Sequence, residues 1–231
     1  MPLRAIPTSA LARRSVAGQL NEVMDRYLLD ATERHLDVCR RLCSVHNVTA
    51  LAERARRRAT VLSKTNRTHS ADILRARDTL ILQLYAEAAP KGSFCGWCDA
   101  SSIEYRGQRV AALGGLLLDP QHRVVARVAK IIGHSAAFEA EIVACVALLQ
   151  TALRHGAERI QAYTDCGALV SLWSAKRHDP RLLKLRTLAR RFRHVDLRMI
   201  PRLHNQSANH IARTIALRRL VAAAAKKTAM H

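Results

Sequence analysis

The chain has 231 residues, of which 49% are hydrophobic and only 4% aromatic, so its core must be built mainly from aliphatic side chains. It carries 38 basic against 18 acidic residues, a net charge of +20. This excess predicts a polyanionic partner, with nucleic acid as the first candidate and a generally basic, solvated surface as the alternative. No apolar run approaches the ~20 residues of a membrane-spanning helix, so we expect no membrane partner.

The first residues contain no secretory signal pattern. They are basic and free of acidic residues until Glu22, so an organellar transit peptide stays open as an alternative. Six scattered cysteines without an export signal are typical of a reducing compartment. We therefore expect a cytoplasmic protein.

Residues 1–90 are predicted to form a basic helical extension, because residues 19–89 contain neither Gly nor Pro. One first helix is expected from apolar residues at helical spacing, namely Leu20, Val23, Tyr27, Ala31, Cys39 and Cys43. Asn47 and Thr49 are candidate caps of a short basic helix, and Ser70 of a third helix. This extension could add nucleic-acid contact or let the chain oligomerise.

Residues 91–231 follow a different pattern and carry 23 basic against 9 acidic residues, a net +14. Three strands are expected at residues 92–101, 110–119 and 123–132, the last two joined by a turn at 119–122. A long helix at 136–155, a strand at 159–164, helical segments to about 193, a strand at 195–200 and a helix from about Ser207 follow. This order predicts an α/β domain with a mixed sheet and helices on its faces.

Three carboxylates of this half are placed where sites form in such domains. Asp99 ends the first strand, Glu141 lies early in the long helix, and Asp165 follows the fourth strand. Such a cluster is costly unless a cation compensates it, and oxygen ligands suit Mg²⁺ or Mn²⁺. Two such ions can hydrolyse a phosphodiester. The alternative is that Asp99 and Asp165 merely cap a turn or helix.

Four segments between Phe94 and Leu217 resemble the ribonuclease H family of the type I pattern. They are CDAS, FEAEIVACVALL, AYTDCGALV and IPRLHNQSANHIA. The resemblance implies a five-stranded mixed sheet of order 3-2-1-4-5 flanked by helices, and metal-dependent cleavage of the RNA strand of RNA–DNA hybrids. It also implies that Asp99, Glu141 and Asp165 are catalytic metal ligands. Glu139 competes with Glu141, but it lies about 200° away around the helix, so both cannot face one site.

The fourth ligand position of the resemblance falls on Asn209. Asn offers a carbonyl oxygen but no charge, and no acidic residue follows Asp196. We therefore expect Asn209 to act as a neutral catalytic metal ligand. His204 and His210 are candidates for proton transfer, although a surface position is the simpler interpretation for each.

The segment from Lys176 to Arg202 is rich in basic residues and lies where the resemblance implies a hybrid-binding protrusion. A solvated helical face is the alternative. The candidate nucleic-acid-binding residues are Lys176, Arg177, Arg181, Lys184, Arg186, Arg190, Arg191 and Arg202.

The sequence therefore predicts a magnesium- or manganese-dependent endonuclease acting on RNA–DNA hybrids. Two alternatives stay open. One is a catalytically weak or inactive nucleic-acid-binding module, and the other is a nuclease of the same fold that acts on DNA.

Overall fold

The computed structural model describes residues 16–43, 47–105, 108–133, 136–175 and 179–228. The chain divides into two compact units, Met1–Ala88 and Ala89–His231. We call them the helical unit and the sheet unit. Within the described ranges, no helix has the length and apolar character needed to cross a membrane.

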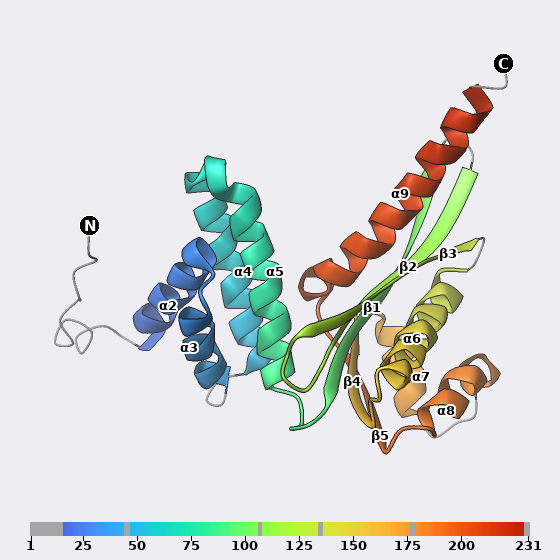
Figure 1. Ribbon diagram of the computed structural model, residues 1–231, viewed down its shortest axis with the longest axis horizontal. Coiled ribbons are helices and arrows are strands. Elements are labelled where there is room, and N and C mark those ends of the chain that lie inside the picture. The colour runs from blue at the N-terminus through green and yellow to red at the C-terminus, as the bar shows by residue number, and fades with distance from the viewer. Residues whose placement is uncertain (1–15, 44–46, 106–107, 134–135, 176–178, 229–231) are drawn as a thin grey trace. The chain divides into compact units, whose positions relative to one another are not determined.

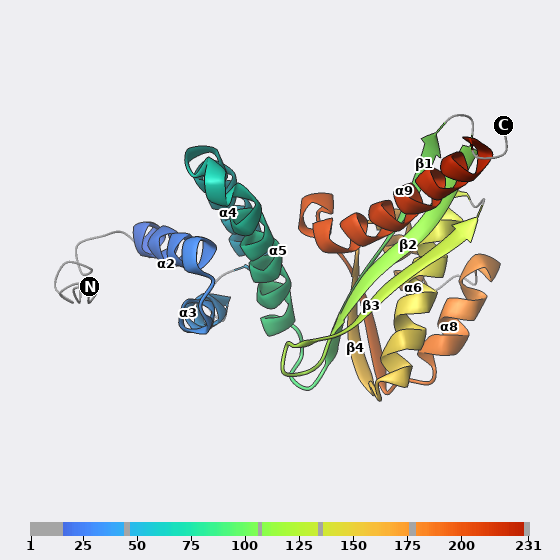
Figure 2. The ribbon, with the colours of Figure 1, turned by 45° about the horizontal axis from the view of Figure 1, so that its top comes forward.

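The helical unit is built around an aliphatic core that includes Met24, Leu51, Leu80 and Leu84, all fully buried. Its longest helices, α4 and α5, lie side by side (Figures 1 and 2). The described residues of the stretch without Gly or Pro are therefore mainly helical, as predicted. Its elements are α2 (Val16–Asp30), α3 (Glu33–Cys43), α4 (Val48–Thr65), the 3-10 turn η1 (Arg67–His69) and α5 (Ser70–Glu87).

The prediction of one continuous first helix is wrong, because the chain breaks at Ala31. Ala31 has a φ of 47°, a left-handed conformation that ends α2. The N–H groups of His35 and Leu36 then donate to the carbonyl oxygen of Thr32, which starts α3. A straight helix from Val16 to Cys43 would extend far beyond the 18-residue α4. The break lets both short helices bury their apolar residues.

The predicted caps are right in one case. Asn47 caps α4, since its Oδ1 accepts hydrogen bonds from the N–H groups of Thr49 at 2.9 Å and Ala50 at 3.3 Å. Thr49 itself lies inside the helix, and α4 has 18 residues rather than being short. Ser70 is the first residue of α5, whose N-cap is His69.

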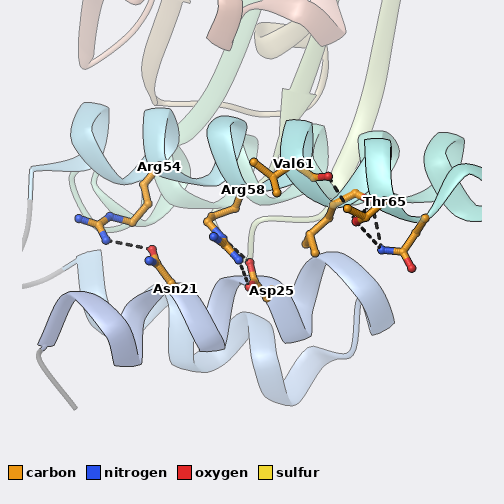
Figure 3. Close-up of polar contacts among 8 residues, drawn as sticks. Asn21, Asp25, Arg54, Arg58, Val61 and Thr65 are labelled. Atoms are coloured by element: carbon orange, nitrogen blue, oxygen red, sulfur yellow. Dashed lines mark hydrogen bonds and ion pairs between the residues drawn. The ribbon is translucent and has the colours of Figure 1, made fainter.

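Two arginines of α4 are paired with polar residues of α2 (Figure 3). Nε of Arg58 donates to Oδ1 of Asp25 at 2.7 Å, and Nη1 of Arg54 donates to Oδ1 of Asn21 at 3.0 Å. Part of the positive charge that the sequence shows is thus neutralised or hydrogen-bonded within the helical unit.

The sheet unit contains a five-stranded mixed sheet with the order β3-β2-β1-β4-β5 (Figure 1). The β1–β2 and β2–β3 pairs are antiparallel, whereas β1–β4 and β4–β5 are parallel. This confirms the predicted fold class and strand order. The strands are β1 (Phe94–Tyr105), β2 (Gln108–Leu118), β3 (Val124–Gly133), β4 (Arg159–Thr164) and β5 (His194–Met199).

The predicted turn between β2 and β3 is organised by Asp119. Its Oδ1 accepts hydrogen bonds from the N–H groups of Gln121 and Arg123, each at 2.9 Å. His122 adopts a φ of 61°, which reverses the chain. The backbone hydrogen bonds and the Arg123 guanidinium also lower the pKa of the Asp119 carboxyl, although its burial opposes them.

Helices cover both faces of the sheet (Figures 1 and 2). On one face α6 lies against β1 and β2 and contributes Leu148 and Leu149 to the main core, while α9 lies against the other face of the same strands. The long helix and the final helix therefore form where the sequence predicts them. The helices are α6 (Ala137–Arg154), α7 (Gly167–Ser174), α8 (Leu183–Ala189) and α9 (Gln206–Thr228).

Candidate functional site

Asp99 and Asp165 lie at the same end of the sheet. Strands β1 and β4 run parallel and pair over residues 94–97 and 160–163, so the residues that follow this pairing emerge together. Asp99 follows it on β1 and is only 3% exposed, while Asp165 directly follows β4. The structure thus brings together two of the three predicted carboxylates.

Glu141 is the helix carboxylate that joins them. It lies in the second turn of α6, where its charge interacts with those of Asp99 and Asp165. Glu139 is exposed, and its charge acts on Arg181. The helical geometry therefore separates the two glutamates as the sequence indicates, with Glu141 in the cluster.

The carboxylates of the cluster have strongly perturbed pKa values. Burial, followed by the charge of Asp165 and a hydrogen bond with it, raises the pKa of Asp99 to about 7. Burial, together with the charges of Asp99 and Asp165, raises the pKa of Glu141 to about 8. Near neutral pH the buried surroundings and the neighbouring carboxylates disfavour the charged form of both groups. Perturbed pKa values of this kind are common at functional sites.

The donor set of the cluster suits a hard divalent cation. One oxygen of each carboxyl, Oδ2 of Asp99 and Oε2 of Glu141, is buried without a hydrogen-bond partner among the described residues. Over the same part of the chain, no three Asp, Glu, His or Cys side chains are already arranged as a metal-binding group. The unpartnered oxygens and the all-oxygen chemistry fit Mg²⁺ or Mn²⁺.

Two residues near the start of α9 oppose the raised pKa values. A hydrogen bond from the Asn209 side chain and the positive charge of Arg202 both lower the pKa of Asp99. Arg202 also lowers the pKa of Glu141. Asn209 therefore lies at the cluster, as predicted, and Arg202 supplies a nearby positive charge.

Asn205 is a site residue that the sequence interpretation missed. It is 1% exposed, and its Nδ2 donates to Oδ1 of Asp165 at 2.7 Å and to the carbonyl oxygen of Cys98 at 3.0 Å. It thus ties the loop before α9 to β1 and to the carboxylate after β4. The available signal was a second Asn four residues before Asn209, one helical turn away.

Two glycines allow the helices to reach the carboxylates. A Cβ at Gly114, which pairs with Asp99 across the sheet, would overlap backbone atoms of Ala208 and Ala212 on α9. A Cβ at Gly96 would stand 2.7 Å from Cδ2 of Leu148 on α6. Because both positions lack a side chain, α9 and α6 approach the strands closely from opposite faces.

The family model described as "Reverse transcriptase-like" matches residues 98–215, slightly more than half of the chain. The match includes the cluster, both glutamates and the start of α9. The chain belongs to the reverse transcriptase-like family. This agrees with the ribonuclease H arrangement of its sheet. A search among curated proteins found no match.

Solved structures similar to the chain include several ribonucleases H. Ribonuclease H1 from Halobacterium salinarum is 25% identical, with 54% of this chain and 97% of that chain covered and a TM-score of 0.48. The N-terminal ribonuclease H domain of a Mycobacterium tuberculosis protein, fused to maltose-binding protein, is 24% identical, with 57% and 99% covered and a TM-score of 0.48. LC11 ribonuclease H1 in complex with an RNA/DNA hybrid is 16% identical, with 55% and 99% covered and a TM-score of 0.49.

His204 is not the surface residue that the sequence favours. It lies in the short 3-10 turn before α9 and is 3% exposed, whereas His210 is exposed. The turn packs against the sheet unit because the following Asn205 is anchored to β1. In this member of the reverse transcriptase-like family, the histidine is therefore part of the folded core next to the site.

The described part of the basic segment before β5, residues 179–193, packs against α6. Leu182 and Leu185 are buried in the main core. Arg186 has a structural role, since its Nη2 donates to the carbonyl oxygen of Leu172 at 3.0 Å and its guanidinium lies over the Trp173 ring.

The remaining candidate nucleic-acid-binding residues differ in their surroundings. Lys176 and Arg177 lie outside the described residues. Arg181 forms an ion pair with Asp179 at 2.7 Å. The other members are exposed, namely Lys184, Arg190, Arg191 and Arg202.

Proposed function

We propose that this protein is a divalent-metal-dependent endonuclease that hydrolyses the RNA strand of RNA–DNA hybrids. Membership of the reverse transcriptase-like family supports a ribonuclease H-type domain. The resemblance of the four motif segments to ribonuclease H is the reason for proposing an RNA–DNA hybrid as the substrate. The net charge of +14 in residues 91–231 suits a nucleic-acid partner.

The observation that carries the proposal is the pair of unpartnered buried oxygens on Asp99 and Glu141, beside Asp165. Buried acceptors without partners are costly, and three neighbouring carboxylates increase the cost. Asp99, Glu141 and Asp165, with Asn209 as a neutral ligand, would hold one or two Mg²⁺ or Mn²⁺ ions. Bound ions of this kind activate a water and stabilise the leaving oxygen of a phosphodiester.

The other residues of the site have roles that follow from their contacts. Asn205 fixes the orientation of Asp165, because its amide is held at the same time by the carbonyl oxygen of Cys98. Arg202 is exposed and close enough to the carboxylates to lower their pKa values, so it is suited to contact a substrate phosphate.

A catalytically weak hybrid-binding module is the second candidate, and Asn209 favours it. Asn contributes no charge at the position where the resemblance implies a carboxylate, so the site holds its cations less tightly. Three retained carboxylates favour a weakened enzyme over an inactive one.

A cleavage assay with Mg²⁺ or Mn²⁺ on labelled RNA–DNA hybrid, duplex RNA and duplex DNA tests the proposal. We expect cleavage of the RNA strand of the hybrid alone, and its loss in Asp165→Asn. The matched control is Asp196→Asn, because Asp196 is paired with Arg198 away from the cluster. Tight binding of the hybrid without cleavage in either metal would support the binding module instead. Cleavage of duplex DNA would make the protein a nuclease of different specificity.

A further inference from the structure

Two adjoining grooves follow the C-terminal half of α6. One, of about 530 Å³, lies between α6 and the edge strand β3 and is closed by Lys184. The other, of about 400 Å³, lies between α6 and the start of the α8–β5 connection. Both include Gln150 and Arg154, so they form one hollowed surface that crosses α6. We call it the α6 groove.

The α6 groove is strongly basic. No acidic residue lines either part, although the sheet unit has nine. Its five Lys and Arg residues are all exposed, and none of them forms an ion pair with another described residue. These residues are Arg127, Lys130, Arg154, Lys184 and Arg191.

The far end of the groove is separate from the carboxylate cluster, whereas its β3 side lies nearer. Lys130 on β3 lies two strands, about 10 Å, from Ala100 on β1. Glu141 lies near the start of α6 and Arg154 at its end, a rise of about 20 Å along the helix axis. A nucleic-acid strand advances ~3.4 Å per nucleotide, so this rise corresponds to about six nucleotides. A substrate cut at the cluster therefore reaches Arg154 only with nucleotides well outside the cut.

The chemistry of the lining suits a phosphodiester backbone. Arginine guanidinium groups match phosphate oxygens in geometry, and lysines add point charge. Gln150 and His155 are exposed among them and carry hydrogen-bonding groups of the kind that contact phosphate and sugar oxygens, whereas the buried Thr151 holds Arg154 through a 2.9 Å hydrogen bond. Aromatic side chains are absent from both linings, so the groove offers no platform for stacked bases. Recognition would therefore depend on the backbone and tolerate any sequence.

We propose that the α6 groove binds the phosphate backbone of the nucleic acid where it continues beyond the cleaved segment. This rests on the proposed function only in taking nucleic acid as the partner. The groove anchors a long substrate on the face of the sheet unit that carries α6. It contributes affinity without taking part in the cleavage.

The test compares two double variants of the full chain. Arg127→Gln/Arg154→Gln removes two charges from the groove. The control Arg218→Gln/Arg219→Gln removes two exposed charges from α9, on the other face of the sheet. Binding is measured in EDTA, so that no cleavage occurs, with a hairpin hybrid of roughly 6 base pairs and a hybrid of roughly 20, since only the longer one spans the ~20 Å from the cluster to Arg154.

We expect the groove variant to bind the long hybrid roughly tenfold more weakly, with a slope of log Kd against log salt that is smaller by about 2. Binding of the short hybrid, and its cleavage with Mg²⁺, should equal those of the wild type, as should all properties of the α9 control. Equal losses in both double variants would mean that only net charge matters and would overturn the proposal. Unchanged binding of the long hybrid would also overturn it. The same holds if polyglutamate competes for the groove as strongly as an oligonucleotide of equal charge. A wild type that binds with this length dependence but never cleaves would refute the proposed function and leave the groove inference standing.

Discussion

The helical unit and the sheet unit are both basic and both contain Arg–carboxylate pairs, but the sheet unit also gathers like charges together. In the helical unit, carboxylates lie beside arginines, as in the pairs Arg58–Asp25, Arg40–Asp37 and Arg56–Glu53. In the sheet unit, three carboxylates lie beside one another, and the basic residues of the α6 groove have no acidic neighbours in its lining. The first arrangement lowers the energy of the fold, whereas the second raises it until a ligand binds.

This difference shows why net charge alone does not locate a nucleic-acid surface. Residues 1–90 contain 15 basic and 9 acidic residues, yet a large part of that charge is used in ion pairs between and within helices. Unopposed charge is concentrated in the sheet unit. A role of the helical unit in nucleic-acid contact or self-association stays a prediction.

The largest expected effect comes from the close approach of α9 to β2. Gly114→Ala should lower the free energy of unfolding of the sheet unit by about 3 kcal/mol, because the new methyl group meets backbone atoms that cannot rotate away. Urea unfolding followed by tryptophan fluorescence measures this, since both tryptophans, Trp97 and Trp173, lie in the sheet unit. Gly92→Ala is the control: its Cβ enters open space and costs only ~1 kcal/mol for the left-handed backbone. Similar losses in both variants would contradict the close approach.

Removing a charge from the cluster should stabilise the metal-free protein. The pKa values of Asp99, about 7, and Glu141, about 8, exceed the usual ~4, so the folded state keeps protons that the unfolded state releases. Wild-type stability in EDTA should therefore fall as the pH rises from about 4 to about 8. Asp99→Asn should gain about 2 kcal/mol at pH 8 and little at pH 4. This is about half of what ~1.4 kcal/mol for each of about three pKa units would give, because the polar amide must still be buried.

The control for this experiment is Asp196→Asn, whose exposed ion pair should change stability by less than ~1 kcal/mol at either pH. A metal-free Asp99→Asn protein that is less stable than wild type at pH 8 would show that the cluster is not strained by its charges.

A smaller effect is expected when a charge is added at the start of α9. Asn209→Asp should tighten Mg²⁺ binding roughly tenfold, about 1.4 kcal/mol, as measured by titration calorimetry. In EDTA the same variant should be less stable than wild type, because a further carboxylate joins the cluster. Gln206→Glu, one turn earlier on the same helix, should leave the Mg²⁺ affinity unchanged. If Asn209→Asp also leaves it unchanged, the cation is not held at this position.

The smallest effect concerns the helical unit. Asp25→Ala leaves Arg58 without its partner across the α2–α4 contact and should cost about 1 kcal/mol, because both side chains are partly shielded from solvent. Far-UV circular dichroism should show the loss, while tryptophan fluorescence of the sheet unit stays as in the wild type. Asp72→Ala breaks a fully surface-exposed pair with Arg75 and should change stability by less than ~0.5 kcal/mol. Equal losses of stability in the two variants would show that the Asp25–Arg58 pair between α2 and α4 stabilises the fold no more than an exposed pair does.

Much of the sheet unit could be predicted from sequence because its signals are local. The turn residue Asp119 and the alternation of strands with a long apolar helix determine the element order. Asp99 lies on β1 just beyond its parallel pairing with β4, and Asp165 directly follows β4, so their meeting at one end of the sheet follows from that pairing. Helical geometry predicts only that Glu139 and Glu141 cannot both face the site, and the preference for Glu141 comes from the resemblance to ribonuclease H.

What could not be predicted depends on contacts between distant segments. The break at Ala31 follows from the limited length of the helices beside it, which no local pattern reveals. Asn205 contacts Asp165 and Cys98, 40 and 107 residues away in sequence. Arg186 resembles its basic neighbours in sequence, but its guanidinium donates hydrogen bonds to the backbone carbonyl oxygens of Leu172 and Ala175. The burial of His204 likewise depends on how the start of α9 is anchored.

The contact at Gly114 also limits which second mutations could repair a defect there. The atoms that an added side chain would meet are the carbonyl oxygen of Ala208 and the amide nitrogen of Ala212, which every residue type possesses. No exchange on α9 can therefore create room, and a suppressor would have to shift the helix as a whole. Such a shift would carry Asn205 and Asn209 away from the carboxylates. Suppressors selected for restored folding should accordingly not restore cation binding.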